Sequence, residues 1–318
     1  KLKAEKKMKK VLILMFAVGV FSVTAFSQVV PDYDFFIENC YSSVKNGKFT
    51  EAVDFCSEAI SKKSDSGTAF YLRAVSYSKT PFGTEIKTPT GETVELSAEQ
   101  RKQFVIADAE KCIRLIPNEY PCYSLIGSFL YASKQKEDAE KAVKNLGEAI
   151  RLGDKDKMLF YYRAIANFNI AVILTAKNAQ AAKFAEQAVA DFTTSISLNP
   201  NEVYNYQRRA EAYEFLGKFE LAIADVTKFL ETNDEDDQLF FKRGKLYLNV
   251  KKYEFAIEDF TKTIELLDEP YNTDLEENLK EILPFRMQAY KALKQKTEFC
   301  KDLKTLNETA DCSKEWKK

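Results

Sequence analysis

Apolar residues recur at spacings of three and four through most of this chain of 318 residues, which predicts a succession of amphipathic helices. The pattern is clearest from Val203 to Asp268, where one arrangement occurs twice with an offset of 34 residues. The repeated positions are Tyr206, Arg209, Ala210, Tyr213, Ala222, Ile223 and Asp225, which return as Phe240, Arg243, Gly244, Tyr247, Ala256, Ile257 and Asp259. A fixed period of this length indicates an array of helical repeats.

Each copy of the arrangement predicts two helices joined by a tight turn. The helices are expected at about Tyr204–Leu216 and Phe219–Glu231, and again at about Leu239–Val250 and Tyr253–Leu266. Turns this short favour antiparallel hairpins. Ala210 or Gly244 on the first helix is expected to face Ala222 or Ala256 on the second, because a large side chain there would hold the two helices apart.

Related positions continue along the chain, so we expect an all-α protein of about seven helical hairpins. The predicted units lie near residues 33–66, 67–119, 120–156, 157–202, 203–236, 237–279 and 280–313. In the long fourth unit the alanine-rich segment Ile170–Ala190 predicts extended helices rather than a loop. The seventh unit has bulkier residues at its apolar positions, as expected of an end hairpin that covers the core on one side only.

Two segments between helices depart from the helical pattern. In the second unit, Thr84–Lys87 and Glu92–Leu96 alternate in polarity around a Pro/Gly turn, which predicts a small β-hairpin that must lie on the array or on a partner. The acidic segment 233–237 predicts a solvated loop with an aspartate that caps the next helix. A calcium loop is the weaker interpretation, because the glycine and terminal glutamate of that pattern are missing.

The order of residues within a unit resembles the tetratricopeptide repeat. A large aromatic residue is followed by a small residue four positions later, an aromatic three further on and a small residue nine later. The resemblance implies a right-handed α-solenoid with a concave ligand-binding face. The best-known variant of that family clamps a C-terminal carboxylate with a lysine and an asparagine on the first helix. Ile37 and Tyr41 stand in those places here, so neither the clamp nor its chaperone partners are implied.

The first 27 residues have the features of a cleavable signal peptide. Lysines precede an apolar run from Val11 to Phe26, which ends in small residues. We expect Met8 to be the natural start, residues 1–7 to be upstream sequence, and cleavage to occur near Ser27–Gln28. A membrane anchor is the weaker interpretation because the run is short. The prediction is therefore an exported bacterial protein, periplasmic or secreted, with a repeat domain over 28–318 and no transmembrane anchor after cleavage.

Arginine and aspartate recur together in five of the seven units. The arginines stand just before the small position of the first helix, and the aspartates at one matched position of the second. They are Arg73, Arg163, Arg209, Arg243 and Arg286, with Asp108, Asp191, Asp225, Asp259 and Asp302. Because the first and third units have neither residue, we expect a bidentate ion pair inside each of the five hairpins. A row of arginines that grips an anionic ligand is the weaker interpretation.

Six cysteines in an exported chain indicate disulfides. Facing positions in a hairpin suggest a bond between Cys40 and Cys56. Cys112 and Cys122 flank a short turn, and Cys300 and Cys312 flank the end of the last helix, so we expect two further local bonds. Buried free thiols are the alternative, and a zinc site is weaker still because no two cysteines are close in sequence.

The charge and composition of the chain argue against an enzyme and against a nucleic-acid-binding protein. The formal net charge is -1, the chain has no histidine, and no phosphate-binding loop or nucleophile motif is present. We therefore expect a protein that is not an enzyme and needs no cofactor or metal.

The remaining candidate is the surface formed by the first helices. The residues expected there are Ile37, Tyr41, Tyr71, Val75, Tyr131, Tyr161, Ile165, Phe168, Gln207, Glu211 and Phe241, aromatic and aliphatic at first and polar later. Such a groove suits a peptide or helix of a partner protein. The leading prediction is an interaction scaffold of the cell envelope. The alternatives are a glycan receptor, because stacked tyrosines also bind sugars, and an accessory subunit of an envelope enzyme.

Overall fold

The computed structural model of the protein describes residues 31–88, 90–175, 178–267, 274–307 and 309–317, and the predicted signal peptide lies outside them. Within these ranges the chain forms helices in consecutive antiparallel pairs. The seven hairpins are α2 (Tyr33–Lys45) with α3 (Phe49–Lys62), α4 (Gly67–Lys79) with α5 (Ala98–Leu115), α6 (Pro121–Leu130) with α7 (Lys136–Arg151), α8 (Met158–Leu174) with α9 (Ala179–Leu198), α10 (Tyr204–Phe215) with α11 (Phe219–Leu230), α12 (Asp237–Asn249) with α13 (Tyr253–Leu267), and α14 (Leu275–Ala292) with α15 (Lys296–Leu306). A short helix, α16 (Cys312–Lys317), follows the seventh hairpin.

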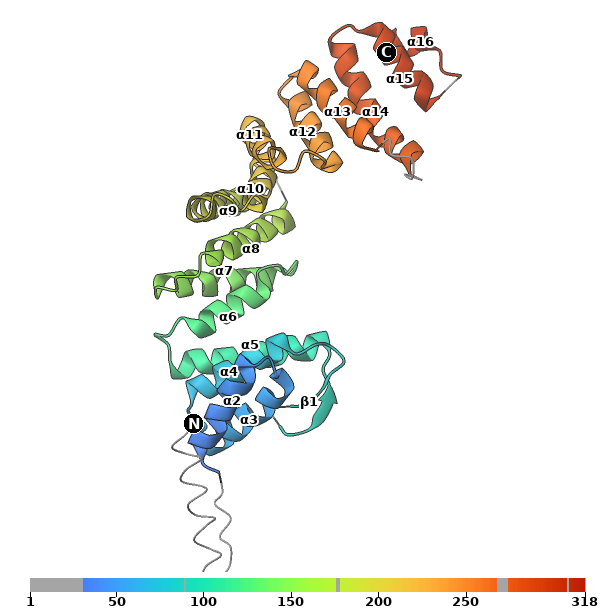
Figure 1. The fold of residues 1–318 in the computed structure, drawn as a ribbon. Helices are drawn as coiled ribbons and strands as arrows, with labels where there is room; N and C mark the ends of the chain where they lie inside the picture. The colour runs from blue at the N-terminus through green and yellow to red at the C-terminus, as the bar shows by residue number, and fades with distance from the viewer. Residues whose placement is uncertain (1–30, 89, 176–177, 268–273, 308, 318) are drawn as a thin grey trace, which may run out of the picture.

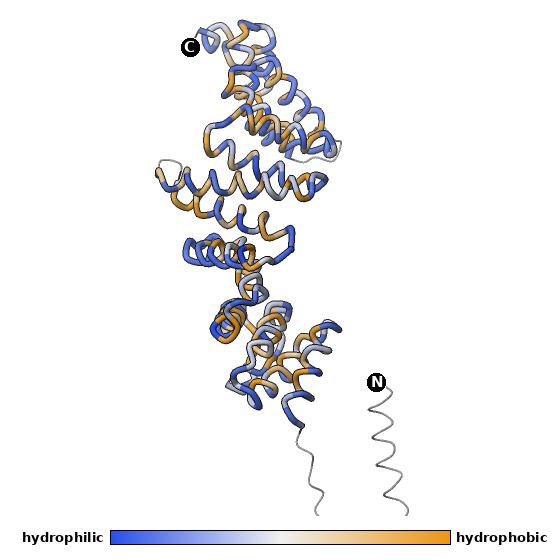
Figure 2. Tube along the Cα trace, turned by 90° about the vertical axis from the view of Figure 1, so that its left-hand side faces the viewer, coloured by the Kyte–Doolittle hydropathy of each residue, from blue (hydrophilic) through white to orange (hydrophobic). Residues whose placement is uncertain are grey.

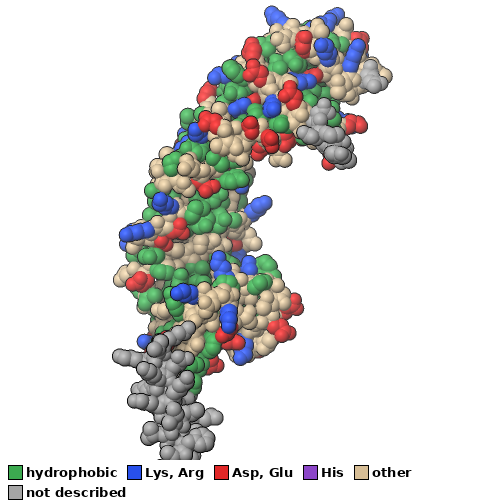
Figure 3. Space-filling view, viewed as in Figure 1, with side chains coloured by type: hydrophobic (Ala, Val, Ile, Leu, Met, Phe, Trp, Pro, Cys, Tyr) green, Lys and Arg blue, Asp and Glu red, His purple; other side chains and the backbone are tan. Residues whose placement is uncertain are grey.

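The hairpins stack side by side in chain order and form a curved α-solenoid (Figure 1). The second helix of each hairpin also packs on the first helix of the next hairpin. Hydrophobic and hydrophilic positions alternate along the helices, which is the pattern of amphipathic helices (Figure 2). The space-filling view shows one side of the molecule hollowed between the N-terminal units and the C-terminal hairpins (Figure 3).

The core of the described chain is a row of local clusters rather than one central core. The cluster with the most members reaches from α4 to α8 and includes Ala74, Ile126, Leu146 and Leu159. Separate clusters follow in the fifth and sixth hairpins and at the sixth–seventh boundary. The stability of each hairpin therefore depends mainly on contacts with its neighbours, as in other repeat proteins.

Several helices begin at a side chain that caps the free backbone N–H groups of the first turn. Ser97 and Gln100 form a reciprocal capping box at the start of α5. At the start of α12, the Asp236 carboxylate accepts a hydrogen bond of 2.9 Å from the N–H of Leu239. The acidic segment thus contains the capping aspartate that its sequence predicts.

The insertion in the second hairpin is a β-hairpin, as predicted. Strands β1 (Glu85–Lys87) and β2 (Thr93–Glu95) pair antiparallel, with Ile86 opposite Val94. Ile86 and Leu96 are buried in one cluster with Tyr77 of α4. The β-hairpin therefore lies on the array, which supplies the apolar contact that two isolated strands lack.

Two helix lengths are informative. The fourth hairpin has helices of 17 and 20 residues, against 12 each in the fifth, so its extra residues lengthen the helices. Helix α14 begins at Leu275, earlier than the start near residue 280 that the sequence predicts, and it continues through Pro284. Glu276 and Glu277 favour this early start, because carboxylates stabilise the positive end of a helix dipole.

Candidate interaction surface

The first helices of successive hairpins line one face of the solenoid, which we call the first-helix face. A hollow of about 500 Å³ lies between α4 and α6, and a second of about 590 Å³ involves α10, α12 and α14. The lining of the first hollow includes Tyr71, Val75, Ser78, Leu125, Ser128 and Phe129. The lining of the second includes Gln207, Glu211, Glu214, Phe241, Lys242, Lys245 and Glu281.

The residues predicted for the groove divide into three groups. Tyr71 and Val75 line the first hollow, and Gln207, Glu211 and Phe241 line the second. The other six lie outside these two hollows: Ile37, Tyr41, Tyr131, Tyr161, Ile165 and Phe168.

Several members of that last group help to hold the helices together. Tyr161, Ile165 and Phe168 pack against the buried core of the fourth hairpin. The rings of Tyr131 and Tyr162 lie 4.4 Å apart, centroid to centroid. Tyr41, in contrast, is 59% exposed. Sequence spacing placed these residues on first helices, but it could not distinguish a side chain in a hollow from one packed on a neighbouring helix.

The two hollows differ in chemistry. In the second, Lys242 lies 3.3 Å from Glu214 and 4.0 Å from Glu211, so it links α12 to α10. The Lys245 ammonium lies 4.2 Å from the centroid of the Phe241 ring, a cation–π distance. The first hollow is framed mainly by aromatic, aliphatic and hydroxyl side chains. Together they offer a largely aromatic and aliphatic site near the N-terminus, with Lys79 and Asp154 also in its lining, and a charged site near the C-terminus.

Two tyrosines on this face stay protonated over a wide pH range. Burial raises the pKa of Tyr71, and the nearby Asp154 carboxylate raises it further. Burial also raises the pKa of Tyr161, against the opposing effect of Arg208. Their phenol groups are therefore neutral hydrogen-bonding groups at physiological pH.

The five arginines and five aspartates lie together in pairs, each within one hairpin. In the fifth hairpin, Nε and Nη2 of Arg209 each donate to a carboxylate oxygen of Asp225 at 2.7 Å. The equivalent bidentate pairs are Arg73–Asp108, Arg163–Asp191, Arg243–Asp259 and Arg286–Asp302. Hydrogen bonding to the aspartate raises the pKa of Arg163 and of Arg209. The arginines are thus engaged inside their hairpins, as a structural role requires.

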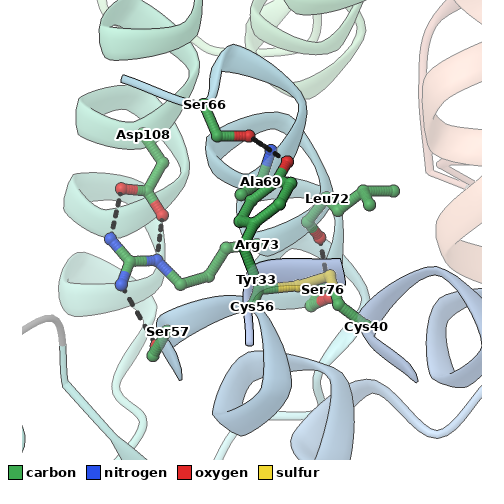
Figure 4. The surroundings of a disulfide bond; sticks show 10 residues. All are labelled: Tyr33, Cys40, Cys56, Ser57, Ser66, Ala69, Leu72, Arg73, Ser76 and Asp108. Carbon is green, nitrogen blue, oxygen red and sulfur yellow. Dashed lines mark hydrogen bonds and ion pairs between the residues drawn. A yellow bond between two sulfur atoms is a disulfide. The ribbon is translucent and has the colours of Figure 1, made fainter. Parts of the chain in front are cut away.

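A contact that the sequence analysis missed joins four of the hairpins to the hairpin before them. In four of the five pairs, Nη1 of the arginine donates to a hydroxyl on the preceding second helix. The acceptors are Ser57 for Arg73 (Figure 4), Thr193 for Arg209, Thr227 for Arg243 and Thr261 for Arg286, at 3.0–3.1 Å. These hydroxyls stand two positions after the aspartate position, a regularity that the aligned units contain. The arginine therefore links two hairpins as well as two helices.

Three disulfides connect residues that are close in sequence: Cys40 with Cys56, Cys112 with Cys122, and Cys300 with Cys312. The first joins α2 to α3 beside the Arg73–Asp108 pair (Figure 4). The second joins the second and third hairpins, and the third joins α16 to α15. Near the third, the rings of Trp316 and Phe299 meet edge to face.

Close crossings of the two helices occur where one partner is small. At Gly244 a Cβ atom would lie 2.6 Å from the ring of Phe260. The closest contacts of such a Cβ atom come from Phe260, four positions after Ala256 on the same helix. At Gly127 a Cβ atom would collide with Leu146 in the same way. In both hairpins the glycine of the first helix makes room for a large side chain on the second helix, Phe260 or Leu146. That large residue stands four positions after the small residue of its own helix, Ala256 or Ala142.

Within the described ranges, no three cysteine or carboxylate groups gather as they would around a metal ion. No helix in those ranges has the length and apolar character needed to cross a bilayer.

Comparison with known proteins agrees with the repeat pattern. The tetratricopeptide repeat family model matches residues 203–236, the fifth unit. No curated protein sequence matches the chain.

Among solved structures the fold is shared with several repeat proteins. The C-terminal part of a TPR repeat-containing protein from Cytophaga hutchinsonii superposes with a TM-score of 0.58 at 14% identity, over 89% of this chain and 99% of that one. YrrB, a TPR protein with an unusual peptide-binding site, superposes with a TM-score of 0.51 at 16% identity, over 71% and 97%. A structure of Naa15/Naa10 bound to HypK-THB gives 0.52 at 13% identity, over 87% and 36%. At these identities the likeness concerns the fold.

Proposed function

We propose that this tetratricopeptide repeat protein is a non-enzymatic interaction scaffold of the cell envelope. Its first-helix face binds an extended segment or a helix of a partner protein. The observation that carries the proposal is the pair of hollows on that face, one largely aromatic and aliphatic and the other charged. A peptide that reached both would offer apolar side chains at one end and polar ones at the other.

Two further observations support this function. YrrB, which shares the fold, is described as having a peptide-binding site. The hollow between α4 and α6 is open and has aromatic walls with hydroxyl groups among them, the composition of surfaces that anchor peptide side chains.

The envelope location rests on the cysteines and on the predicted signal peptide. All six cysteines lie in disulfides, which persist in oxidising compartments and are rare in the cytosol. The signal peptide, with cleavage near Ser27–Gln28, remains a prediction from sequence, and N-terminal sequencing of the exported protein tests it.

A blocked hollow tests the binding site. Peptides displayed on phage are selected against the chain from residue 28 onward, and the affinity of an enriched peptide is measured for Ser128→Arg and Ser197→Arg. Ser128 lines the first hollow, so a long charged side chain there should weaken binding at least ~10-fold, or about 1.4 kcal/mol.

Ser197 is a matched control. Both serines donate to the backbone carbonyl three residues earlier, but Ser197 lies exposed on α9, on a second helix. Ser197→Arg should bind as the unchanged protein does. Equal affinity of the two variants for every selected peptide would count against this groove.

A further inference from the structure

Tyrosine completes the arginine contact in the last three hairpins. The residue four positions after each arginine is Tyr213, Tyr247 or Tyr290, and its ring centroid lies 5.6–5.8 Å from the guanidinium carbon. In the second hairpin the equivalent residue is also a tyrosine, Tyr77, which packs under the β-hairpin. The guanidinium thus has a carboxylate, a hydroxyl and a phenol ring around it.

The fourth hairpin lacks two of these three partners. Asn167 stands where the others have tyrosine, and Gly147 on α7 stands where they have serine or threonine. Arg163 keeps its ion pair, with Nε and Nη2 at 2.8 and 2.7 Å from Asp191. A Cβ atom added to Gly147 would lie 3.7 Å from Nη1, so this nitrogen points toward the missing hydroxyl.

The two small residues leave a hollow of about 520 Å³ on the side of the solenoid formed by the second helices. Its lining includes Val143, Gly147, Arg163, Asn167, Gln187 and Asp191. Asn167 is only 2% exposed, and its Oδ1 has no hydrogen-bond partner among the described residues. A buried carbonyl oxygen without a hydrogen-bond partner is unfavourable, and it occurs here at the position where this hairpin departs from the others.

We propose that this hollow binds the phenol side chain of a tyrosine on a partner protein. A phenol hydroxyl can accept a hydrogen bond from Nη1 of Arg163, as the threonine hydroxyls do from the arginines of later hairpins. The ring would occupy the space above Gly147, beside the guanidinium, as the chain's own tyrosines do in later hairpins.

The lining carries charges of both signs, Arg163 and Lys144 beside Asp191 and Glu148, so charge by itself selects neither an anion nor a cation. A neutral aromatic group with one hydroxyl meets no net repulsion from this lining. The site is separate from the first-helix face, so a test of this site does not depend on whether the proposed groove binds a partner.

A neighbouring hollow extends this surface. It has a volume of about 580 Å³, lies between α5 and α7, and shares Lys144 and Glu148 with the hollow beside Arg163 and Asn167. It is lined by Ile126 and Asn145, which replace the arginine and aspartate in the third hairpin. Departures from the repeat pattern thus gather on one stretch of surface, where a partner could cover both hollows.

The test uses two probes that differ by one hydroxyl, N-acetyl-tyrosinamide and N-acetyl-phenylalaninamide. Each is titrated into the isotopically labelled full chain and followed by amide chemical shifts. The tyrosine probe should shift resonances around Gly147, Arg163 and Asn167, and the phenylalanine probe should bind at least ~10-fold more weakly, since it lacks the hydroxyl that bonds to Nη1 of Arg163.

Two variants fill the hollow from within. Asn167→Tyr restores the residue of the other hairpins, and Gly147→Thr restores the hydroxyl; each should reduce probe affinity at least ~10-fold while keeping the fold. A gain-of-site variant, Tyr213→Asn with Thr193→Gly, repeats the same two changes one hairpin later and should create a second site. Shifts that map elsewhere, equal binding of both probes, or full binding by Asn167→Tyr would overturn the proposal.

Discussion

One pair of residues sets the distance between the two helices of a hairpin. The pair is Ala210 with Val226 in the fifth hairpin and Gly244 with Phe260 in the sixth, each sixteen residues apart. Where the second residue grows from valine to phenylalanine, the first shrinks from alanine to glycine. In the first hairpin the same two positions hold Cys40 and Cys56, so a disulfide takes the place of this contact. The exchange of volume is not uniform along the array, because the fourth hairpin pairs Ala164 with Phe192 and the second pairs Ala74 with Ala109.

Gly244→Ala should destabilise the protein despite the higher helix propensity of alanine. The new methyl group would meet the Phe260 ring, and such overpacking costs about 1–3 kcal/mol. Adding Phe260→Val recreates the pair found in the fifth hairpin and should recover part of the loss. Urea unfolding of the two single variants and the double variant measures the coupling. Additive losses would show that the two side chains do not compete for the same space.

At the scale of elements, the arginine holds three helices together. It bonds to the aspartate of its own hairpin, which fixes the angle between first and second helix. Its third nitrogen bonds to the preceding second helix, which fixes the step to the next hairpin. Because the guanidinium is planar and its donors diverge, one side chain can satisfy both contacts.

Arg209→Ala and Asp225→Ala should each cost about 3 kcal/mol, because either change leaves a mostly buried charge without its partner. The double variant should cost less than the sum of the two by about 1–3 kcal/mol. The exposed pair Lys280–Glu276, at 2.6 Å within α14, is the control, and its coupling should be smaller because solvent screens it. Chemical unfolding measures both cycles. A coupling at Arg209–Asp225 no larger than that of the control would contradict a structural role.

Across the whole molecule, stability is a property of neighbouring hairpins, and the last hairpin has a neighbour on one side only. Its free side is covered by α16, which Cys300–Cys312 ties to α15 and which places Trp316 on Phe299 at 5.2 Å between ring centroids. Trp316 is the single tryptophan of the chain, so its fluorescence reports on this end alone.

Removal of that disulfide should let the array open from its C-terminal end. In Cys300→Ser/Cys312→Ser, the urea midpoint seen by Trp316 fluorescence should fall below the midpoint seen by far-ultraviolet circular dichroism, because a local disulfide of this loop length contributes about 3 kcal/mol. The variant Cys40→Ala/Cys56→Val alters the opposite end and should leave the fluorescence midpoint in place. Coincident midpoints in the first variant would mean that the chain unfolds as one unit.

The sequence alone was enough to predict the helical hairpins and the β-hairpin, and its period places the arginines, aspartates and cysteines at matching positions of neighbouring helices. Each of these features joins residues that the helix period and a short turn bring together within one unit, or across one turn. Helix periodicity therefore predicts that Arg209 and Asp225 face each other before any tertiary contact is known.

Only the tertiary structure decided which first-helix residues line hollows, which hydroxyl the third arginine nitrogen reaches, and where Asn167 and Gly147 leave space. These features depend on how successive hairpins step and rotate, and that geometry comes from packing between units rather than from spacing within them. The absence of a large side chain has no sequence signal of its own. The space that it leaves becomes a site only where the neighbouring helices do not close over that space.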